Sequence, residues 1–267
     1  MNQLIKGDCL DVMPFIADKS VDLIIADLPY GKTQNEWDKI IDTKKMWKEF
    51  NRVIKDDGAI LLFAEPPFNI HLAASNLKMY RYDWVWEKPT ASGFLNSKKM
   101  PMKAAEYILV FYKKLPTYNP IMTKGHKKEV SKESQDKCIN SSNYGKSYKR
   151  TAYCSEERYP RSVLKFSSDK QFCQVHSTQK PMALIKYFVE TYTNPGAVIL
   201  DPTAGSGTTG VACEELGDRN YILIEKYTHE IAQKRLLEAQ GKVGLFGQKK
   251  SYCNISSEQN LLTMASL

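Results

Sequence analysis

Two patterns of apolar and polar positions alternate along this chain: short, almost wholly apolar runs, and longer segments with apolar residues every three or four positions. The short runs predict buried strands, and the longer segments predict amphipathic helices. Strands are expected at 4–8, 20–31, 59–67, 80–89, 104–114, 197–202 and 220–225. Helices are expected at 9–17, 42–58, 68–79, 180–196, 208–217 and 228–241.

Strands that alternate with helices and carry apolar residues on both faces predict a mostly parallel sheet covered on each side, the doubly wound α/β class. In such sheets ligands bind beyond the carboxyl ends of the strands. Several predicted strands are followed directly by an acidic residue. We expect one crevice to be lined by the loops that begin at Asp8, Asp27, Glu65, Asp201 and Glu225.

Positive charge is concentrated in one quarter of the chain. Between Lys113 and His176 there are 14 Lys and Arg against 6 Asp and Glu, a local excess equal to the net charge of +8 of the whole chain. Aromatic residues are interleaved with these charges, and cations that neutralise phosphates beside rings that stack on bases suit a nucleic acid. A solvated, loop-rich insertion has the same composition, so both interpretations stay open.

Length and hydropathy are those of an ordinary globular protein. With 267 residues, 42% of them hydrophobic, the chain can bury one principal core and carry an insertion. No apolar run approaches the roughly 20 residues of a membrane-spanning helix, and no export leader is visible, so we expect no membrane partner and a cytoplasmic location. The 6 cysteines lie far apart and are expected to be reduced.

The strongest local motif is the glycine-rich segment from Ala197 to Gly210. Gly205, Gly207 and Gly210 fit the pattern GxGxxG between a predicted strand and a predicted helix, and Glu225 ends the next strand. Glycines allow a tight turn and close approach of the backbone to a ligand, and a carboxylate placed in this way accepts hydrogen bonds from ribose hydroxyls. We therefore expect a cofactor that contains a nucleoside.

A nicotinamide dinucleotide is one candidate, which would make the chain an oxidoreductase with the pyrophosphate at the helix near Thr208. Asp201 argues against it, because a carboxylate at the mouth of the loop repels a pyrophosphate but can receive the ammonium of an amino acid. Only 42 residues follow Glu225, too few for the usual continuation of a dinucleotide domain.

A second motif, DLPYG, follows directly after a predicted buried strand. Asp27 offers a carboxylate beside the crevice, Pro29 stiffens the loop, and Tyr30 offers a flat face. The exocyclic amine of adenine or cytosine is a poor nucleophile because its lone pair is delocalised into the ring. Hydrogen bonds to the Asp27 carboxylate and the Leu28 carbonyl would localise that pair and aim it at an electrophilic methyl group. A base in a duplex must be flipped out to reach such a site. The alternative is an Asx-type turn that closes a strand.

Together, DLPYG and DPTAGSGTT resemble the motifs of the β group of DNA amino-methyltransferases, which use S-adenosylmethionine, and the resemblance covers nearly all of residues 3–240. It implies a seven-stranded, Rossmann-like methyltransferase sheet that is circularly permuted. The implied divisions are a catalytic half at 1–113, an inserted basic target-recognition region at 114–175, a cofactor-binding half at 176–247 and a mobile tail at 248–267. DNA is the implied partner, and the family also suggests a homodimer and a cognate restriction endonuclease.

The resemblance assigns roles to individual residues. The catalytic loop is Asp27, Leu28, Pro29 and Tyr30, with Leu28 where the family more often has proline. Trp84, Trp86 and Lys88 fall where a wall of the base pocket is expected, with at least one Trp in the core. The cofactor residues are Asp8 and Cys9 near the adenine, Glu225 at the ribose, Ser177, Thr178 and Lys180 near the methionine, Asp201, Thr203, Ala204, Gly205, Ser206, Gly207, Thr208 and Thr209 in the glycine loop, and in addition Asp27 and Lys226.

Other chemistries lack their motifs in this sequence. There is no Pro-Cys dipeptide for methylation at carbon 5 of cytosine and no HxE with PCxxC for zinc deamination. The phosphate loop GxxxxGK[ST] and the metal motifs HExxH and CxxC are also missing, so we expect no metal.

The resemblance favours adenine N6 as the target, because the cytosine-directed members more often carry Ser or Thr at the position of Asp27. Cytosine N4 is the first alternative. An RNA base or a protein glutamine amide is a second, although glutamine-directed relatives usually have Asn at this position and lack a basic insertion. A nicotinamide-dependent oxidoreductase and a non-catalytic DNA-binding module are the remaining alternatives.

Overall fold

The computed structural model describes residues 2–32, 35, 37–131, 138–141, 145–148, 152–167 and 179–241. Contacts divide the chain into two compact units, Met1–Asn119 with Ser162–Leu267, and Pro120–Arg161. The predicted tail and the predicted cofactor residues Ser177 and Thr178 lie outside the described residues.

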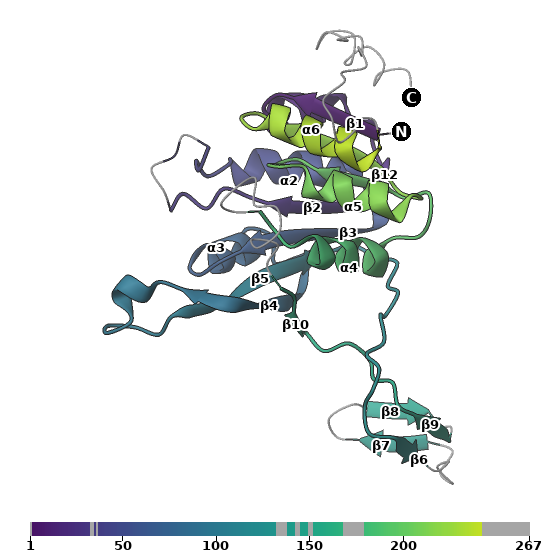
Figure 1. The fold of residues 1–267 in the computed structure, drawn as a ribbon. Helices are drawn as coiled ribbons and strands as arrows, with labels where there is room; N and C mark the ends of the chain where they lie inside the picture. Colours follow the sequence, from purple (N-terminus) through teal and green to yellow (C-terminus); the bar gives the residue numbers. More distant parts are fainter. Residues whose placement is uncertain are drawn as a thin grey trace. The chain divides into compact units, whose positions relative to one another are not determined.

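One eight-stranded sheet forms the centre of the larger unit (Figure 1). Its order is β1 (Asn2–Lys6), β12 (Asn220–Glu225), β11 (Val198–Asp201), β2 (Val21–Asp27), β3 (Ile54–Ala64), β5 (Lys103–Phe111), β4 (Tyr80–Ser92) and β10 (Val163–Lys165). Every neighbouring pair is parallel except the two pairs that β5 makes. The carboxyl ends of the parallel strands and the amino end of β5 therefore meet at one edge.

The doubly wound α/β fold is confirmed, with one strand more than the seven expected. The additional strand is β10, which comes from residues inside the predicted insertion and pairs with β4 at the edge of the sheet. Strand β11 lies between β12 and β2 although it follows β2 by about 170 residues, which is the permuted order that the resemblance implies.

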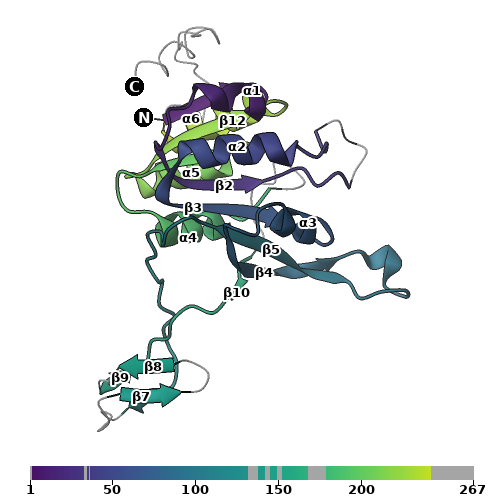
Figure 2. The same ribbon diagram turned by 180° about the vertical axis from the view of Figure 1, so that it is seen from behind.

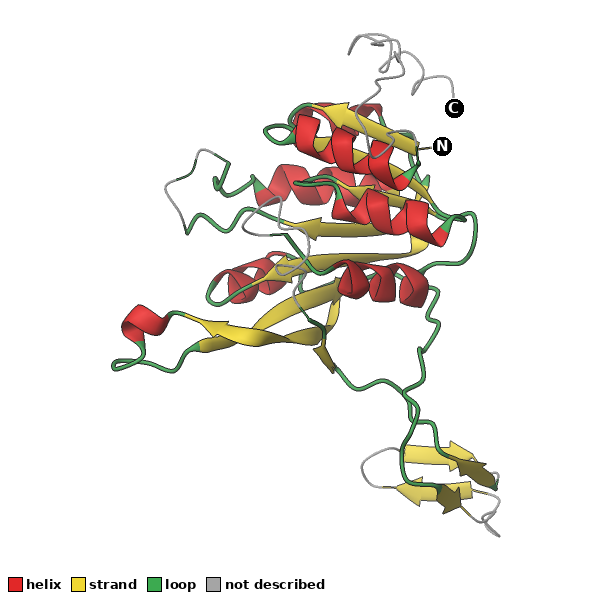
Figure 3. Ribbon diagram, in the orientation of Figure 1, coloured by secondary structure: helices red, strands yellow, loops and turns green. Residues whose placement is uncertain are grey.

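Helices cover both faces of the sheet (Figure 3). One face carries α1 (Cys9–Val12), the 3₁₀ helix η1 (Met13–Phe15), α2 (Thr43–Val53) and α3 (Phe68–Ser75), which Figure 2 shows in front. The other face carries α4 (Met182–Tyr192), α5 (Thr208–Leu216) and α6 (His229–Ala239). Both faces of the sheet are apolar and need to be covered. In β2, Ile24 and Ala26 belong to the core on the first face, and Leu23 and Ile25 belong to the core on the second.

The helix predicted at 42–58 is shorter in the structure. It ends at Val53, and Ile54 already has extended backbone angles and pairs with Val21 of β2. The side chain of Ile54 is buried there, so pairing and burial outweigh the helical spacing of the sequence. The helix predicted at 9–17 is divided into α1 and η1, because Pro14 has no N–H to continue the α-helical ladder.

The smaller unit consists of short antiparallel pairs. β6 (Glu129–Ser131) pairs with β9 (Tyr153–Ser155), and β7 (Cys138–Ser141) pairs with β8 (Gly145–Tyr148). The Thr123 and Arg158 backbones form a further bridge. In the described part of the chain, no helix has the length and apolar character needed to cross a membrane.

A buried hydrogen bond ties α4 to the sheet. Trp84 Nε1 of β4 donates to Tyr192 Oη of α4 at 2.7 Å, and the Tyr82 hydroxyl lies 2.8 Å from the same oxygen. Both Trp84 and Tyr192 are buried, so neither group can exchange its partner for water.

We expect Tyr192→Phe to lower the free energy of unfolding by about 1–3 kcal/mol, because it leaves the Trp84 indole N–H buried without an acceptor. At this chain length that corresponds to a fall in Tm of about 2–10 °C in a thermal melt. Tyr159→Phe removes a hydroxyl from an exposed tyrosine and should leave Tm unchanged. A Tyr192→Phe protein as stable as the wild type would show that this bond contributes nothing net.

Candidate active site

The DLPYG loop begins where β2 ends. The Asp27 carboxylate accepts two side-chain hydrogen bonds, from the Tyr30 hydroxyl at 2.7 Å on Oδ1 and from Lys180 Nζ at 2.7 Å on Oδ2. Thr203 Oγ1 donates to the Asp27 main-chain oxygen at 3.1 Å. Among the residues that the structure describes, no hydrogen bond reaches the Leu28 carbonyl oxygen. The loop therefore presents an oriented carboxylate next to a main-chain acceptor.

A second buried carboxylate, that of Glu106 on β5, lies beside Asp27. Lys180 Nζ is 2.8 Å from Glu106 Oε1 as well as 2.7 Å from Asp27, so one ammonium joins two carboxylates. Glu106 is only 3% exposed and also contacts Lys88 Nζ at 2.9 Å. Lys88 reaches Glu65 at 2.9 Å, and Lys32 reaches the other oxygen of Glu65 at 3.2 Å. From Asp27 to Lys32, negative and positive side chains therefore alternate, so that each buried charge has a partner of opposite sign.

The pKa shifts of these side chains show which interactions favour the charged form of each. Burial raises the pKa of Asp27, and the ammonium of Lys180 opposes this rise. Burial also acts on Glu106, but Lys180 and Lys88 together hold the pKa of Glu106 below its usual value. For Lys180, burial is outweighed by Asp27 and Glu106, and its pKa is raised. Burial and the neighbouring carboxylates raise the pKa of Tyr30. Lys180 therefore carries a positive charge at neutral pH.

The glycine-rich loop connects β11 to α5. Gly207 is the N-cap of α5 with φ +78°, and a Cβ there would lie 3.0 Å from the Cβ of Ala232. At Gly210 a Cβ would lie 2.6 Å from Leu223 Cδ1, so this position lets the helix pack closely on β12. Arg235 Nη1 of α6 donates to the Ser206 carbonyl at 2.7 Å and fixes the loop from behind. Both glycines are required by close packing, as in nucleotide-binding loops.

Two acids stand at the ends of the strands beside this loop. Asp201, at the end of β11, accepts hydrogen bonds from Thr209 Oγ1 at 2.6 Å and from the Thr203 N–H at 3.2 Å. Burial raises the pKa of Asp201 to about 7. Glu225, at the end of β12, accepts three backbone N–H groups, those of residues 205, 227 and 228, at 2.7–2.8 Å. The Glu225 carboxylate is thereby fixed in direction.

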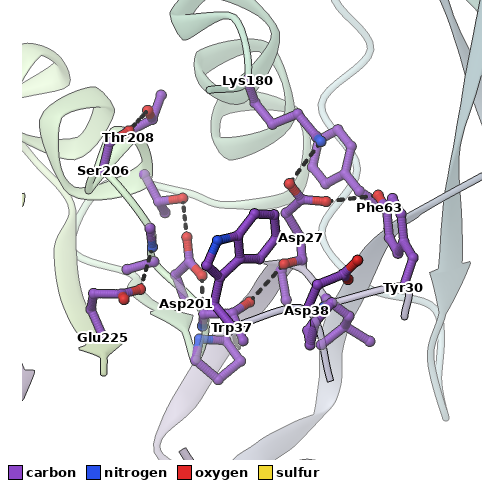
Figure 4. Close-up of a pocket in the computed structure, with 18 of the residues that line it drawn as sticks. Asp27, Tyr30, Trp37, Asp38, Phe63, Lys180, Asp201, Ser206, Thr208 and Glu225 are labelled. Atoms are coloured by element: carbon purple, nitrogen blue, oxygen red, sulfur yellow. Dashed lines mark hydrogen bonds and ion pairs between the residues drawn. The ribbon is translucent and has the colours of Figure 1, made fainter. Parts of the chain in front are cut away.

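All five acids expected at one crevice line a single cavity of about 880 Å³ (Figure 4). In the view of Figure 4, Asp201 and Glu225 lie to one side, Asp27 and Lys180 to the other. At the Glu225 end, Asp8 caps α1 by accepting the N–H of residue 10 and is 3.1 Å from Lys226 Nζ.

The cavity brings together most of the residues predicted for the site. Its lining includes Asp8, Cys9, Asp27, Leu28, Pro29, Tyr30, Lys180, Asp201, Thr203, Ala204, Gly205, Ser206, Thr208, Thr209, Glu225 and Lys226. Gly207 does not line it and acts as the helix cap described above. Trp86 and Lys88 also line the cavity, whereas Trp84 is part of the core. Lys180, expected near the methionine of the cofactor, lines the same cavity and contacts the Asp27 carboxylate.

Sequence reasoning missed several residues of the site, among them Glu106, Asp38 and Trp37. Glu106 could have been found, because it is the only acid in the apolar strand AAEYILVF and so had to be buried with a partner. Asp38 accepts the N–H groups of Gly31 and Lys32, both at 2.8 Å, and closes the catalytic loop. Trp37 lines the cavity beside it. Nothing in the local sequence marks Trp37 or Asp38, since their loop has no periodic pattern.

Comparisons with known proteins agree with one another. A family model described as DNA methylase, of the N6/N4 methyltransferase type, matches residues 21–234. The chain is 28% identical over 279 residues to the type II methyltransferase M.HinfI of Haemophilus influenzae, an alignment that covers 89% of this chain and 69% of the relative.

Solved structures show the same fold. The M1.HpyAVI–SAM complex matches with a TM-score of 0.60 and 24% identity, covering 88% of this chain and 100% of that chain. The cytosine-N4-specific PvuII DNA methyltransferase matches with a TM-score of 0.62 and 16% identity, covering 99% of this chain and 91% of that chain. Because the family model spans well over half of the sequence, the chain belongs to the N6/N4 DNA methylase family of S-adenosylmethionine-dependent DNA methyltransferases.

Proposed function

We propose that this protein transfers a methyl group from S-adenosylmethionine to the N6 amine of a flipped adenine in DNA. The observation that carries the proposal is the Asp27 carboxylate, held by Tyr30 and Lys180 in the cavity that also contains the glycine-rich loop. The acid at this position favours adenine, because the resemblance associates Ser or Thr there with cytosine N4.

The residues beside the glycine loop fit the cofactor. Asp201 is a buried acid that lines the cavity beside the glycine-rich loop, where its carboxylate can receive an ammonium such as that of the methionine moiety. Glu225 is fixed by three backbone N–H groups and keeps acceptor capacity for ribose hydroxyls. When bound, S-adenosylmethionine supplies an electrophilic methyl group.

The catalytic loop supplies acceptors for the two protons of the target amine. One N–H would donate to the Asp27 carboxylate and the other to the Leu28 carbonyl, which leaves the nitrogen lone pair directed away from the ring plane. Tyr30 would stack on the base. Asp27 need not be a strong base, because the proton leaves after the nitrogen has become positively charged.

Lys180 has a positioning role in this proposal. An ionised carboxylate accepts stronger hydrogen bonds than the protonated acid, whereas burial raises the pKa of Asp27 and so favours the protonated form. The ammonium of Lys180, itself 2.8 Å from Glu106, keeps Asp27 charged and fixes one of its oxygens. The other oxygen accepts the Tyr30 hydroxyl and keeps a second lone pair for the amine.

The basic residues 114–175 remain our prediction for the target-recognition region. A homodimer and a cognate restriction endonuclease likewise remain predictions, supported by the family resemblance.

The decisive test is transfer of labelled methyl from S-adenosylmethionine to unmethylated duplex DNA, followed by digestion to nucleosides and their separation. Label in N6-methyldeoxyadenosine is the expected result. Label in N4-methyldeoxycytidine would replace adenine by cytosine as the target. Cofactor binding without label in DNA would direct the test to RNA and to protein amides.

Asp27→Ala should lower kcat for methyl transfer by about 10²–10³-fold, because it removes the acceptor that orients the amine. Equilibrium binding of S-adenosylmethionine should change little. Asp57→Ala removes an exposed acid of β3 and serves as the control that keeps full activity. Retention of activity in the Asp27→Ala protein would exclude Asp27 from the chemistry.

Lys180→Met should lower kcat at neutral pH and move the acidic limb of the pH profile to higher pH by about 1 unit or more. The sign follows because the lost ammonium lowers the pKa of Asp27 in the wild type, so its removal lets that pKa rise. Lys165→Met, which removes an exposed cation paired with Glu87, should leave the profile in place. A lower kcat with an unmoved acidic limb would indicate a merely structural role.

Binding of S-adenosylmethionine should release protons below pH 7, because Asp201 has a pKa of about 7 and must ionise to hold an ammonium. We expect the apparent Kd to rise by up to about tenfold for each pH unit below 7, measured by calorimetry in buffers of different ionisation enthalpy.

Without ligand, the same raised pKa of Asp201 makes the stability of the fold decrease as the pH rises from 3.8 to about 7. Asp201→Asn should abolish both dependences; a pH-dependent Kd in that variant would assign the proton to another group.

A further inference from the structure

The turn between β4 and β5 exposes an unusual set of apolar side chains. In residues 93–102, the hairpin tip, Leu95 is 97% exposed, Phe94 75%, Met100 55% and Met102 38%. Single exposed apolar residues are common on protein surfaces, but four within ten residues mark a surface that meets a partner.

The backbone of the hairpin tip is turned by its own hydrogen bonds. Gly93 has φ +91° and begins the 3₁₀ helix η2 (Phe94–Asn96). The N–H of Asn96 donates to the Gly93 carbonyl at 3.0 Å, and the N–H of Met100 donates to the Asn96 carbonyl at 3.0 Å. Figure 1 shows the hairpin continuing past the sheet, with η2 at its end. The fold therefore holds Phe94 and Leu95 out in solvent.

The charge of the hairpin selects the kind of partner. From Lys88 to Ala105 the chain has four lysines and no acidic residue. Lys98 and Lys99 follow the apolar pair of the tip after two intervening residues, and both are exposed. Apolar side chains beside exposed cations fit a partner with phosphates outside and a stacked apolar interior, which is duplex nucleic acid.

The base of the same hairpin forms a wall of the cavity. Lys88, Pro89 and Thr90 of β4 and Glu106 of β5 all line it. From Thr90 to Gly93 the extended chain spans about 10 Å, comparable with the depth of a DNA groove of about 7.5–8.5 Å. An element that reaches into a groove from this position is next to the pocket that would receive the target base.

We propose that the hairpin tip inserts Phe94 and Leu95 into duplex DNA beside the target base pair, while Lys98 and Lys99 contact the adjacent phosphates. This inference rests on the proposed function, since a base leaves the stack only if its lost stacking is compensated. Apolar wedges compensate that loss in proteins that kink DNA. The wedge fills the gap and keeps the base from returning to it.

The test uses the double variant Phe94→Ala with Leu95→Ala in the full chain. Sequencing of long duplex DNA methylated by the wild type maps the modified sites. A short duplex that contains one of these sites then serves as the substrate. We expect kcat/KM of the double variant to fall by about tenfold or more on this duplex. On the same duplex with an abasic nucleotide opposite the target, activity should return to within about threefold of the wild type, because no base pair has to be broken.

Matched measurements separate the wedge from other causes. Leu115→Ala truncates a residue that is 78% exposed and follows β5 at the opposite end of that strand, and it should leave both activities unchanged. Lys98→Gln with Lys99→Gln should reduce the slope of log affinity against log salt by about 2, at about 0.9 for each phosphate contact. Binding of S-adenosylmethionine should be normal in every variant.

Several results would overturn the wedge. They are full activity of the double variant on the paired duplex, an equal loss on the paired and abasic duplexes, or a change in sedimentation that makes the tip an interface between two copies of the chain. An unchanged slope of log affinity against log salt would show that Lys98 and Lys99 do not contact the phosphates. A wild-type protein that binds cofactor but labels no DNA would instead overturn the proposed function, and the wedge with it.

Discussion

The ammonium of Lys180, held between the buried carboxylates of Asp27 and Glu106, is the interaction on which the active site depends. Two carboxylates so close together would not both stay ionised without a cation, because burial and mutual repulsion each favour the protonated form. The reversed direction of β5 makes the arrangement available. Glu106 lies near the amino end of that strand, which meets the carboxyl ends of β2 and β3 at the same edge of the sheet. An all-parallel sheet would place the start of that strand at the far edge.

Residues far apart in the sequence fix the two halves of the site to each other. Thr203 of the glycine-rich loop donates to the main-chain oxygen of Asp27, which is 176 positions away, and Lys180 contacts Asp27 across 153 positions. Arg235 holds the glycine loop from the opposite side through Ser206. Because these contacts are direct, the position of the glycine-rich loop and the position of the Asp27 carboxylate are not independent. A methyl transfer between two bound groups needs this fixed relation.

Local patterns in the sequence were sufficient for the fold and for both loops, but not for contacts between distant elements. The strands of the sheet other than β10 follow from apolar runs, and the helix after the glycines follows from GxGxxG. The early end of α2 was missed because the pairing of Ile54 with Val21 is a tertiary effect that helical spacing does not contain. Lys180 was predicted for the cofactor, and its contact with Asp27 and Glu106 depends on the register of three separate elements. Asp38 was missed for the same reason, because its role depends on a contact that exists only in the folded loop, where it accepts the N–H groups of Gly31 and Lys32.

Strand β4 connects the buried site to the exposed tip of its hairpin. Trp86 is anchored by a hydrogen bond from its Nε1 to the Phe166 carbonyl at 3.1 Å, and Trp84 is anchored on Tyr192. Lys88, two residues beyond Trp86, is fixed by Glu65 and Glu106. The strand is therefore anchored up to the wall of the cavity by side-chain contacts, whereas the tip beyond it lies in solvent. In the proposed wedge, the tip that would insert into the duplex and the wall of the cavity that would receive the base belong to the same hairpin, so β4 links the two events.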